Sequence, residues 1–327
     1  MKASLLSWGA VTPAGFGKDA VDRAWPLSEV KSGSGRPCLA GLVNREAEAL
    51  TQWEKEPRLR RASPLTYYMV EATHQALEKA PQIDRSRTGV IATFFLGCLV
   101  YSVRFYRQVT EQGRRFGAPV LFPETVFNSP LSHVVATLGL GGPVYSQIGD
   151  KSCWATALRT AQCWLSNGDA DHVLVLGGEE FEAHELDALR AGGLLRHGLV
   201  PAEGAAAVLL GGEGSDNSAR INTLAEGFTF TGKDDAGEAA KACLNEFPTG
   251  SPILETSTGW TKKMVKEASA GHRVIPSPFT QVDGFTISTA CDTIRAAQKI
   301  TAGEENEIIV PYWGLTTQCS AALLDRG

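Results

Sequence analysis

Two residues in one short stretch could act as a nucleophile. Lys151 and Cys153 lie in Gly149-Asp150-Lys151-Ser152-Cys153, between an apolar run and a segment with helical periodicity. A cysteine at the start of a helix can accept an acyl group as its thiolate, and a desolvated lysine can form a Schiff base or act as a base. The stretch therefore indicates acyl transfer through Cys153 or amine chemistry through Lys151, unless both residues are structural.

Structural roles are the alternatives. Asp150 precedes Lys151, and an adjacent carboxylate keeps an amine charged, which favours a structural ion pair over a plug in a pocket or a chemical role. Free cysteine usually packs as a small hydrophobe, so we expect Cys153 to be buried. His272 lies in a turn that enters a predicted strand, and we expect a surface histidine there; a relocated acid or base is the alternative.

These residues stand in a strand-helix-strand unit that occurs twice. The first copy comprises residues 143–148, 153–165 and 173–176, and the second comprises 273–276, 285–300 and 308–310. Short apolar runs without alternation suit strands that are covered on both faces, and such units build parallel sheet. The repeat predicts a duplicated, layered α/β protein. An ordinary doubly wound domain with chance similarity between its halves is the alternative.

Composition restricts the class of protein. The chain has 327 residues and a formal net charge of −5, so it can bury a large core and gives no indication of a nucleic acid or membrane partner. Two basic clusters, Lys55 to Arg61 and Arg104 to Arg115, indicate a solvated helix face or a dock for an acidic carrier protein. No apolar run approaches the roughly 20 residues that span a bilayer, and we expect a cytoplasmic protein.

The cysteines and glycines argue against bound cofactors. Seven cysteines are scattered without a Cys-x-x-Cys pair, which disfavours a disulfide framework or a zinc site. No glycine-rich phosphate loop follows a predicted strand, and Gly33-Ser34-Gly35 lies in a loop without that context. We therefore expect reduced thiols, no metal and no nucleotide cofactor.

Several motifs together resemble those of β-ketoacyl synthases of the thiolase superfamily. They are Thr12-Pro13-Ala14-Gly15, Asn128-Ser129-Pro130, Gly139 to Pro143 and Glu203-Gly204-Ala205. In that family the cysteine lies nine residues after the glycine of a Gly-Pro pair and seventeen before a Gly-Asp-like turn. Counting from Gly142 and from Gly168 gives Lys151 both times. The resemblance implies a layered α-β-α-β-α fold in one compact unit, with an N-terminal half 1–212 and a shortened C-terminal half 213–327.

The resemblance also implies what the chain lacks. Ketosynthases use a cysteine thiolate and two neutral histidines that hold the enolate, with a lysine five residues before the second histidine. Here Thr256 stands at the first histidine position, Phe285 at the second and Thr280 at the lysine position, so none of the catalytic residues is intact. Cys153 would come into register only if the following helix lost two residues, which would rotate it by about 200°.

A ketosynthase-like subunit without its nucleophile resembles a chain-length factor, although those proteins usually carry glutamine where this chain has Lys151. The resemblance implies a non-catalytic partner of an active ketosynthase in polyketide or specialised fatty-acid biosynthesis, in a heterodimer across Val144–Ile148. An unorthodox acyltransferase that uses Cys153 or Lys151 is one alternative. A homodimeric pseudoenzyme that binds an acyl carrier protein, or serves as a scaffold, is another. A strand this apolar at a sheet edge would be an aggregation hazard unless it were paired.

Overall fold

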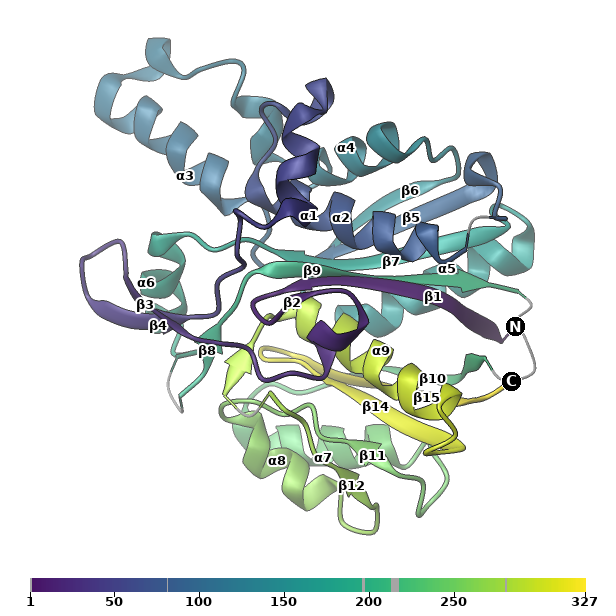
Figure 1. Ribbon diagram of the computed structural model, residues 1–327. Coiled ribbons are helices and arrows are strands. Elements are labelled where there is room, and N and C mark those ends of the chain that lie inside the picture. The colour runs from purple at the N-terminus through teal and green to yellow at the C-terminus, as the bar shows by residue number, and fades with distance from the viewer. Residues whose placement is uncertain (1, 81, 196–197, 213–217, 280) are drawn as a thin grey trace.

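The computed structural model describes residues 2–80, 82–195, 198–212, 218–279 and 281–327 and has five layers, α-β-α-β-α (Figure 1). One outer layer contains α2 (Pro64–Glu78) and α4 (Ser129–Leu138), and the other contains α7 (Lys233–Leu244) and α8 (Thr261–Ala268). The middle layer contains α5 (Cys153–Asn167) and α9 (Thr286–Thr301). The layered fold that we predicted is confirmed.

The two sheets between these layers have the same strand order, which confirms the duplication. The first comprises β1 (Ala3–Thr12), β5 (Thr88–Phe94), β6 (Val144–Ile148), β7 (His172–Glu179) and β9 (Gly204–Gly211). The second comprises β10 (Ala219–Thr229), β11 (Ile253–Leu254), β12 (Val274–Ile275), β14 (Glu307–Trp313) and β15 (Gln318–Arg326). The order is β6-β5-β7-β9-β1 in one sheet and β12-β11-β14-β15-β10 in the other. The sheets meet where Ala3 of β1 pairs with Ile221 of β10.

Smaller elements connect and surround the sheets. They are β2 (Gly15–Phe16), the hairpin β3 (Ser28–Lys31) and β4 (Pro37–Ala40), α1 (Glu48–Thr51), α3 (Leu99–Arg107), α6 (Ala183–Ala191), β8 (Val200–Pro201) and β13 (Val282–Asp283). Short 3-10 or π segments are η1 (Lys18–Val21), η2 (Gln52–Lys55), η3 (Pro57–Leu59), η4 (Arg85–Arg87), η5 (Gln108–Gln112), η6 (Arg114–Phe116) and η7 (Phe122–Thr125). β8 and β13 pair in parallel and join the two halves.

A proline marks the start of α4. Residues 122–125 form a 3-10 turn, and α4 begins at Ser129, with Asn128 before it and Pro130 in its first turn. Proline lacks an N–H and is tolerated in the first turn of a helix rather than inside it. Pro130 therefore marks where α4 can begin.

The inner strands of the first sheet, β5, β7, β9 and β1, are buried on both faces, whereas the edge strand β6 is partly exposed. Along β7, Val173 and Val175 pack in the cluster around the middle helices, whereas Leu174 and Leu176 pack in the cluster around α2. Alternate side chains of a strand point to opposite faces, so a continuous apolar run fits a sheet that is covered twice. The apolar run that we predicted as a buried strand is confirmed.

The middle helices lie close to the sheets because small residues face them. A Cβ added to Gly177 of β7 would come 2.2 Å from the carbonyl oxygen of Thr286, at the start of α9. Such a contact is sterically impossible, so glycine allows the N-terminus of α9 to approach the end of β7. This close approach brings the beginning of α9 next to the loop before α5.

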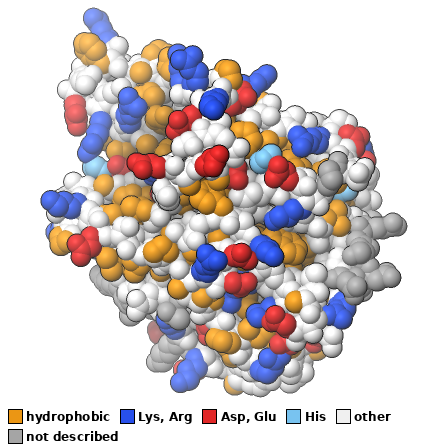
Figure 2. Space-filling model, viewed as in Figure 1, with side chains coloured by type: hydrophobic (Ala, Val, Ile, Leu, Met, Phe, Trp, Pro, Cys, Tyr) orange, Lys and Arg blue, Asp and Glu red, His pale blue; other side chains and the backbone are white. Residues whose placement is uncertain are grey.

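The surface carries charges of both signs. On the face in Figure 2, Lys and Arg side chains are interspersed with Asp and Glu. None of the helices that the structure describes has the length and apolarity needed to cross a membrane. The division that we predicted between residues 1–212 and 213–327 falls at residues 213–217, outside the described residues, and stays a prediction.

Candidate functional site

Lys151 lies at the centre of the molecule, in the loop between β6 and α5. Its side chain is 1% exposed, and its Nζ donates to Asp283 Oδ2 and to the carbonyl oxygen of Thr256, at 3.1 Å each. Both partners belong to the second half of the chain. The structure therefore brings together Lys151 and Thr256, two of the positions that the resemblance singles out.

Asp283 is the counter-ion of Lys151 and is fully buried in β13. Its Oδ2 also accepts a hydrogen bond from Thr258 Oγ1, and its Oδ1 accepts one from the backbone N–H of Phe285 at 2.8 Å. A buried ion pair is stable only when further hydrogen bonds satisfy both groups, and these bonds satisfy the carboxylate. Asp283 thus binds three segments at one point.

The ion pair that we expected at Lys151 is present, but its partner is not the neighbouring Asp150. Asp150 accepts hydrogen bonds from the N–H and Oγ of Ser152, at 3.1 and 2.6 Å, and from the N–H and Oγ1 of Thr316, at 3.0 and 2.8 Å. Four donors already surround this carboxylate. It holds the loop before α5 against the C-terminal half, while the lysine side chain extends towards Asp283.

Phe285 is held in a strained backbone conformation at the start of α9. It has φ 51° and ψ −108°, and no other described non-glycine residue has a positive φ. Such conformations cost of order 1–3 kcal/mol and persist only where surrounding contacts impose them. The Asp283 carboxylate binds the Phe285 N–H, and the Phe285 ring packs against Phe95 with centroids 4.8 Å apart. The ring belongs to an apolar cluster with Leu189, Leu199 and Leu315.

Cys153 is the first residue of α5 and is buried. Burial, with the nearby Asp150 and Glu179 carboxylates, raises the pKa of the Cys153 thiol well above its ordinary value. A nucleophilic cysteine needs the opposite environment, one that favours the thiolate. The burial predicted for Cys153 is confirmed, and its surroundings suit a packed thiol.

Two further predictions concern His272 and Thr280. His272 is half-buried and donates from Nδ1 to the carbonyl oxygen of Ser251, 2.9 Å away, in the turn before β12. This places it at a chain turn as we expected. Thr280 lies outside the described residues, so the prediction for the lysine position stays a prediction. Within the described ranges, no group of three or more His, Cys, Asp or Glu side chains could hold a metal ion.

Sequence reasoning missed the buried carboxylates around this site. Glu179, at the end of β7, accepts backbone hydrogen bonds from Phe95, Leu96 and Gly97 and one from Thr286 Oγ1. Burial raises the pKa of Glu179 to about 7. Asp292 of α9 lies near Lys151 and binds Arg295 at 3.1 Å, and burial raises its pKa to about 6.

A signal for these residues was present in the sequence. Glu179 directly follows an apolar strand, and Asp283 stands between apolar residues just before a helix. Acidic residues at strand ends commonly hydrogen-bond the loops and helix starts that follow. The sequence could not show which loops these carboxylates contact, because most of the contacting segments lie far away along the chain.

Comparison with known proteins identifies the family. Residues 21–213 match the family described as Beta-ketoacyl synthase, N-terminal domain, whereas no curated protein matches the chain significantly. The structure is similar to that of the ishigamide ketosynthase/chain length factor, with a TM-score of 0.77 and 18% identity over 100% of this chain and 99% of that chain. The structure is also similar to that of a β-ketoacyl synthase from Burkholderia phymatum, with a TM-score of 0.75 and 14% sequence identity over 100% of this chain and 99% of that chain.

A third similar structure is that of a type II polyketide synthase acyl-carrier protein in complex with its ketosynthase bound to the hexaketide. It has a TM-score of 0.74 and 14% identity, over 100% of this chain and 99% of that chain. At these identities the structures show a shared fold, and the family match adds the sequence relationship over most of the first half. The chain belongs to the β-ketoacyl synthase family.

Proposed function

We propose that this chain is a non-catalytic ketosynthase-like subunit, of the chain-length-factor type, that partners an active ketosynthase in polyketide or specialised fatty-acid biosynthesis. The buried ion pair between Lys151 and Asp283 carries the proposal. An ammonium in such a pair has no free electron pair, and an amine in its place forms an amide rather than the thioester that condensation passes through. The scaffold is kept while its nucleophile is replaced by a structural contact.

The positions expected for the two histidines support the same conclusion. The Thr256 carbonyl accepts from Lys151, and its Oγ1 donates to the carbonyl oxygen of Pro311 at 2.8 Å. The Phe285 ring has no hydrogen-bond donor. Enolate formation needs donors aimed at the developing oxyanion. Neither side chain supplies one, so we assign no condensing activity to this subunit.

The comparisons support the kind of assembly that we propose. One similar structure is named as a ketosynthase/chain length factor, and another contains a ketosynthase in complex with its acyl-carrier protein. Both match this chain over its whole length. We therefore propose an active ketosynthase as the partner, with an acyl carrier protein as a further binding partner of the complex.

The edge strand β6 is the surface that we propose for this partner. It pairs with β5 on one side, and three of its apolar side chains are half exposed: Val144 (47%), Tyr145 (50%) and Ile148 (57%). A free, apolar strand edge invites pairing with another strand. A strand from the partner that bonded to β6 would cover these side chains and continue the sheet.

The two alternatives are an acyltransferase, which the geometry fits less well, and a homodimeric pseudoenzyme, which predicts a different complex. An acyltransferase that uses Cys153 or Lys151 would need an accessible nucleophile, and both side chains are buried. A homodimeric pseudoenzyme would use the same β6 edge with a second copy of this chain. The composition of the complex therefore distinguishes the heterodimer from the homodimer.

The test is purification of the tagged protein from its native host, followed by light scattering and intact-mass analysis. We expect a one-to-one complex with a ketosynthase that has a cysteine at the position of Lys151. A dimer that contained this chain alone would contradict the heterodimer and support the homodimeric scaffold. Covalent acylation of this chain would contradict the non-catalytic role.

A further inference from the structure

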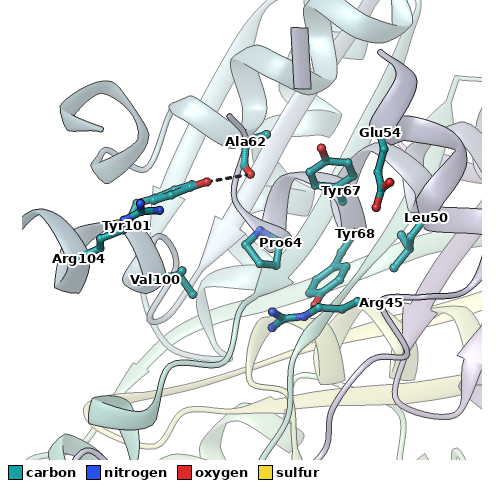
Figure 3. Close-up of a pocket in the computed structure, with 10 residues that line it drawn as sticks. All are labelled: Arg45, Leu50, Glu54, Ala62, Pro64, Tyr67, Tyr68, Val100, Tyr101 and Arg104. Atoms are coloured by element: carbon teal, nitrogen blue, oxygen red, sulfur yellow. Dashed lines mark hydrogen bonds between the residues drawn. The ribbon is translucent and has the colours of Figure 1, made fainter. Parts of the chain in front are cut away.

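A cavity of about 360 Å³ lies away from Lys151, between α2 and α3 (Figure 3). Its walls come from three separate segments of the chain. The lining residues are Arg45, Leu50, Glu54, Ala62, Pro64, Tyr67, Tyr68, Val100, Tyr101 and Arg104. A volume of this size is in the range of small-molecule sites.

The middle of the cavity offers aromatic and aliphatic surface rather than free hydroxyl groups. Tyr67 Oη donates to the carbonyl oxygen of Leu59 at 3.0 Å, and Tyr101 Oη donates to that of Ala62 at 3.3 Å. The hydroxyl of Tyr68 accepts from Arg45 Nε at 2.7 Å. Because the hydroxyls already have partners, the tyrosine rings are what a ligand would contact.

The walls of the cavity are held in place without a ligand. The buried Glu180 accepts hydrogen bonds from the N–H of Leu65, at the start of α2, and of Val100, at the start of α3, at 3.3 and 2.8 Å. The bond from Tyr101 to Ala62 ties the same two walls together. A preformed cavity loses little conformational entropy when a ligand binds.

The charged residues around the cavity differ in whether they have a partner. Arg45 is balanced by Glu203, which accepts from its Nη2 at 2.6 Å. Within the described residues, the side chains of Arg104 and Glu54 have no hydrogen-bond or ion-pair partner, and they do not reach each other. Figure 3 places Arg104 beside Tyr101 on one side of Pro64 and Glu54 beside Tyr67 on the other.

The pKa values of Tyr67 and Tyr101 are shifted by burial and by the two separate charges, Glu54 and Arg104. Burial and then the Glu54 carboxylate raise the pKa of Tyr67. At Tyr101 the Arg104 guanidinium opposes the rise in pKa that burial causes and to which Glu124 and Glu180 add. Each charge is therefore close to one tyrosine, at its own end of the cavity. A positive end and a negative end are separated by aromatic rings.

We propose that this cavity binds a small zwitterion with an aromatic or apolar body. Its acid group would bind Arg104, its body would lie on the tyrosine rings, and its amine would face Glu54. A simple anion would leave Glu54 unpaired beside it, and a simple cation would leave Arg104 unpaired. The site is separate from the contacts of Lys151 and does not depend on the proposed function.

The test is isothermal titration calorimetry of the intact protein with 4-(aminomethyl)benzoate and its two half-analogues, 4-methylbenzoate and 4-methylbenzylamine. We expect the zwitterion to bind about tenfold more tightly than either half-analogue, because each end adds a charge-assisted hydrogen bond. Equal affinity for all three compounds, or no binding of any of them at millimolar concentration, would overturn the proposal.

Two variants test which charged group of the ligand binds Arg104 and which binds Glu54. Arg104→Gln is expected to lower the affinity for the zwitterion and for 4-methylbenzoate about three- to tenfold and to leave the affinity for 4-methylbenzylamine unchanged. Glu54→Gln is expected to lower the affinity for the zwitterion and for 4-methylbenzylamine but not for 4-methylbenzoate. Both side chains are exposed, so the fold should be retained, which circular dichroism checks. Arg115→Gln, an exposed arginine outside the cavity, is the control. If neither variant changed any affinity by more than the control does, the assignment would be wrong.

Discussion

The ammonium of Lys151 and the carboxylate of Asp283 lie 3.1 Å apart, both almost completely shielded from water, and they join the two halves of the chain. Moving two charges out of water is costly, and their attraction offsets this cost only when the surrounding hydrogen bonds are complete. The backbone of Thr256 and Phe285 and the hydroxyl of Thr258 supply those bonds. Lys151, at the position expected for a nucleophile, thus forms a buried contact that links the two halves of the chain.

Replacing Lys151 with methionine should destabilise the protein strongly. Methionine keeps much of the side-chain volume but leaves Asp283 buried without its counter-ion, and breaking a buried pair in this way costs about 3–5 kcal/mol. Urea unfolding followed by circular dichroism measures the change in the free energy of unfolding. We expect the midpoint to fall well below that of the unchanged protein.

The double variant Lys151→Met, Asp283→Asn provides the control, because it removes both charges and should recover a large part of the loss. Lys241→Met breaks an exposed pair with Glu238 and should change stability by less than about 0.5 kcal/mol. If Lys151→Met were as mild as Lys241→Met, the buried pair would not hold the halves together.

Alkylation should distinguish the buried Cys153 from an exposed thiol in the same molecule. Cys163 is exposed on α5, whereas Cys153 is buried and its thiol has a raised pKa, so iodoacetamide at pH 8 should modify Cys163 first. Peptide mass spectrometry over time gives both rates, and we expect them to differ by at least tenfold. Equal rates in the folded protein would instead indicate a reactive Cys153.

The sequence predicted the repeated strand-helix-strand unit and a layered α/β protein, and the resemblance implied five layers, because these depend on local patterns and on spacing within one half. It did not predict Asp283 as the partner of Lys151. Asp283 lies 132 positions further along the chain, in β13, which pairs with β8 in the folded protein. The neighbouring Asp150 was the nearest carboxylate in sequence, yet its oxygens are taken by Ser152 and Thr316. Contacts between the halves are set by the assembled fold.

The buried Glu185 should make the protein less stable as the pH rises. Burial and the neighbouring carboxylates raise the pKa of Glu185 well above its ordinary value of 4.5. Above pH 4.5, and until the pH reaches the raised pKa, the folded state therefore keeps a proton that the unfolded state releases, so the free energy of unfolding decreases with pH. Glu185→Gln removes this titration while its side-chain oxygen can still accept the hydrogen bond from the Glu182 N–H.

We expect Glu185→Gln to be progressively more stable than the unchanged protein from pH 5 to pH 8, by up to about 1.4 kcal/mol for each pH unit over which the folded state retains the proton. Urea unfolding at pH 5, 6.5 and 8 tests this. Glu238→Gln, at an exposed site on α7, should show no such trend. A difference for Glu185→Gln that stayed constant across this range would rule out the titration.

A charge on the edge strand β6 should prevent assembly without unfolding the subunit. Tyr145 is half exposed on β6, and Tyr145→Lys would place an ammonium in the surface that we propose for the partner. Light scattering should then show a monomer. Val274 is 45% exposed on β12, the corresponding edge strand of the other sheet, so Val274→Lys is a matched control that should still assemble. Loss of assembly in the control alone would place the interface at the opposite edge.

Acyl loading of the purified complex shows which subunit provides the nucleophile. The complex isolated from the native host is incubated with an activated acyl thioester, and the intact mass of each subunit is measured. We expect the partner ketosynthase to gain the acyl mass and this chain, with Lys151 paired to Asp283 and Cys153 buried, to gain none. An acyl group on this chain, mapped to Cys153 or Lys151, would contradict the non-catalytic role.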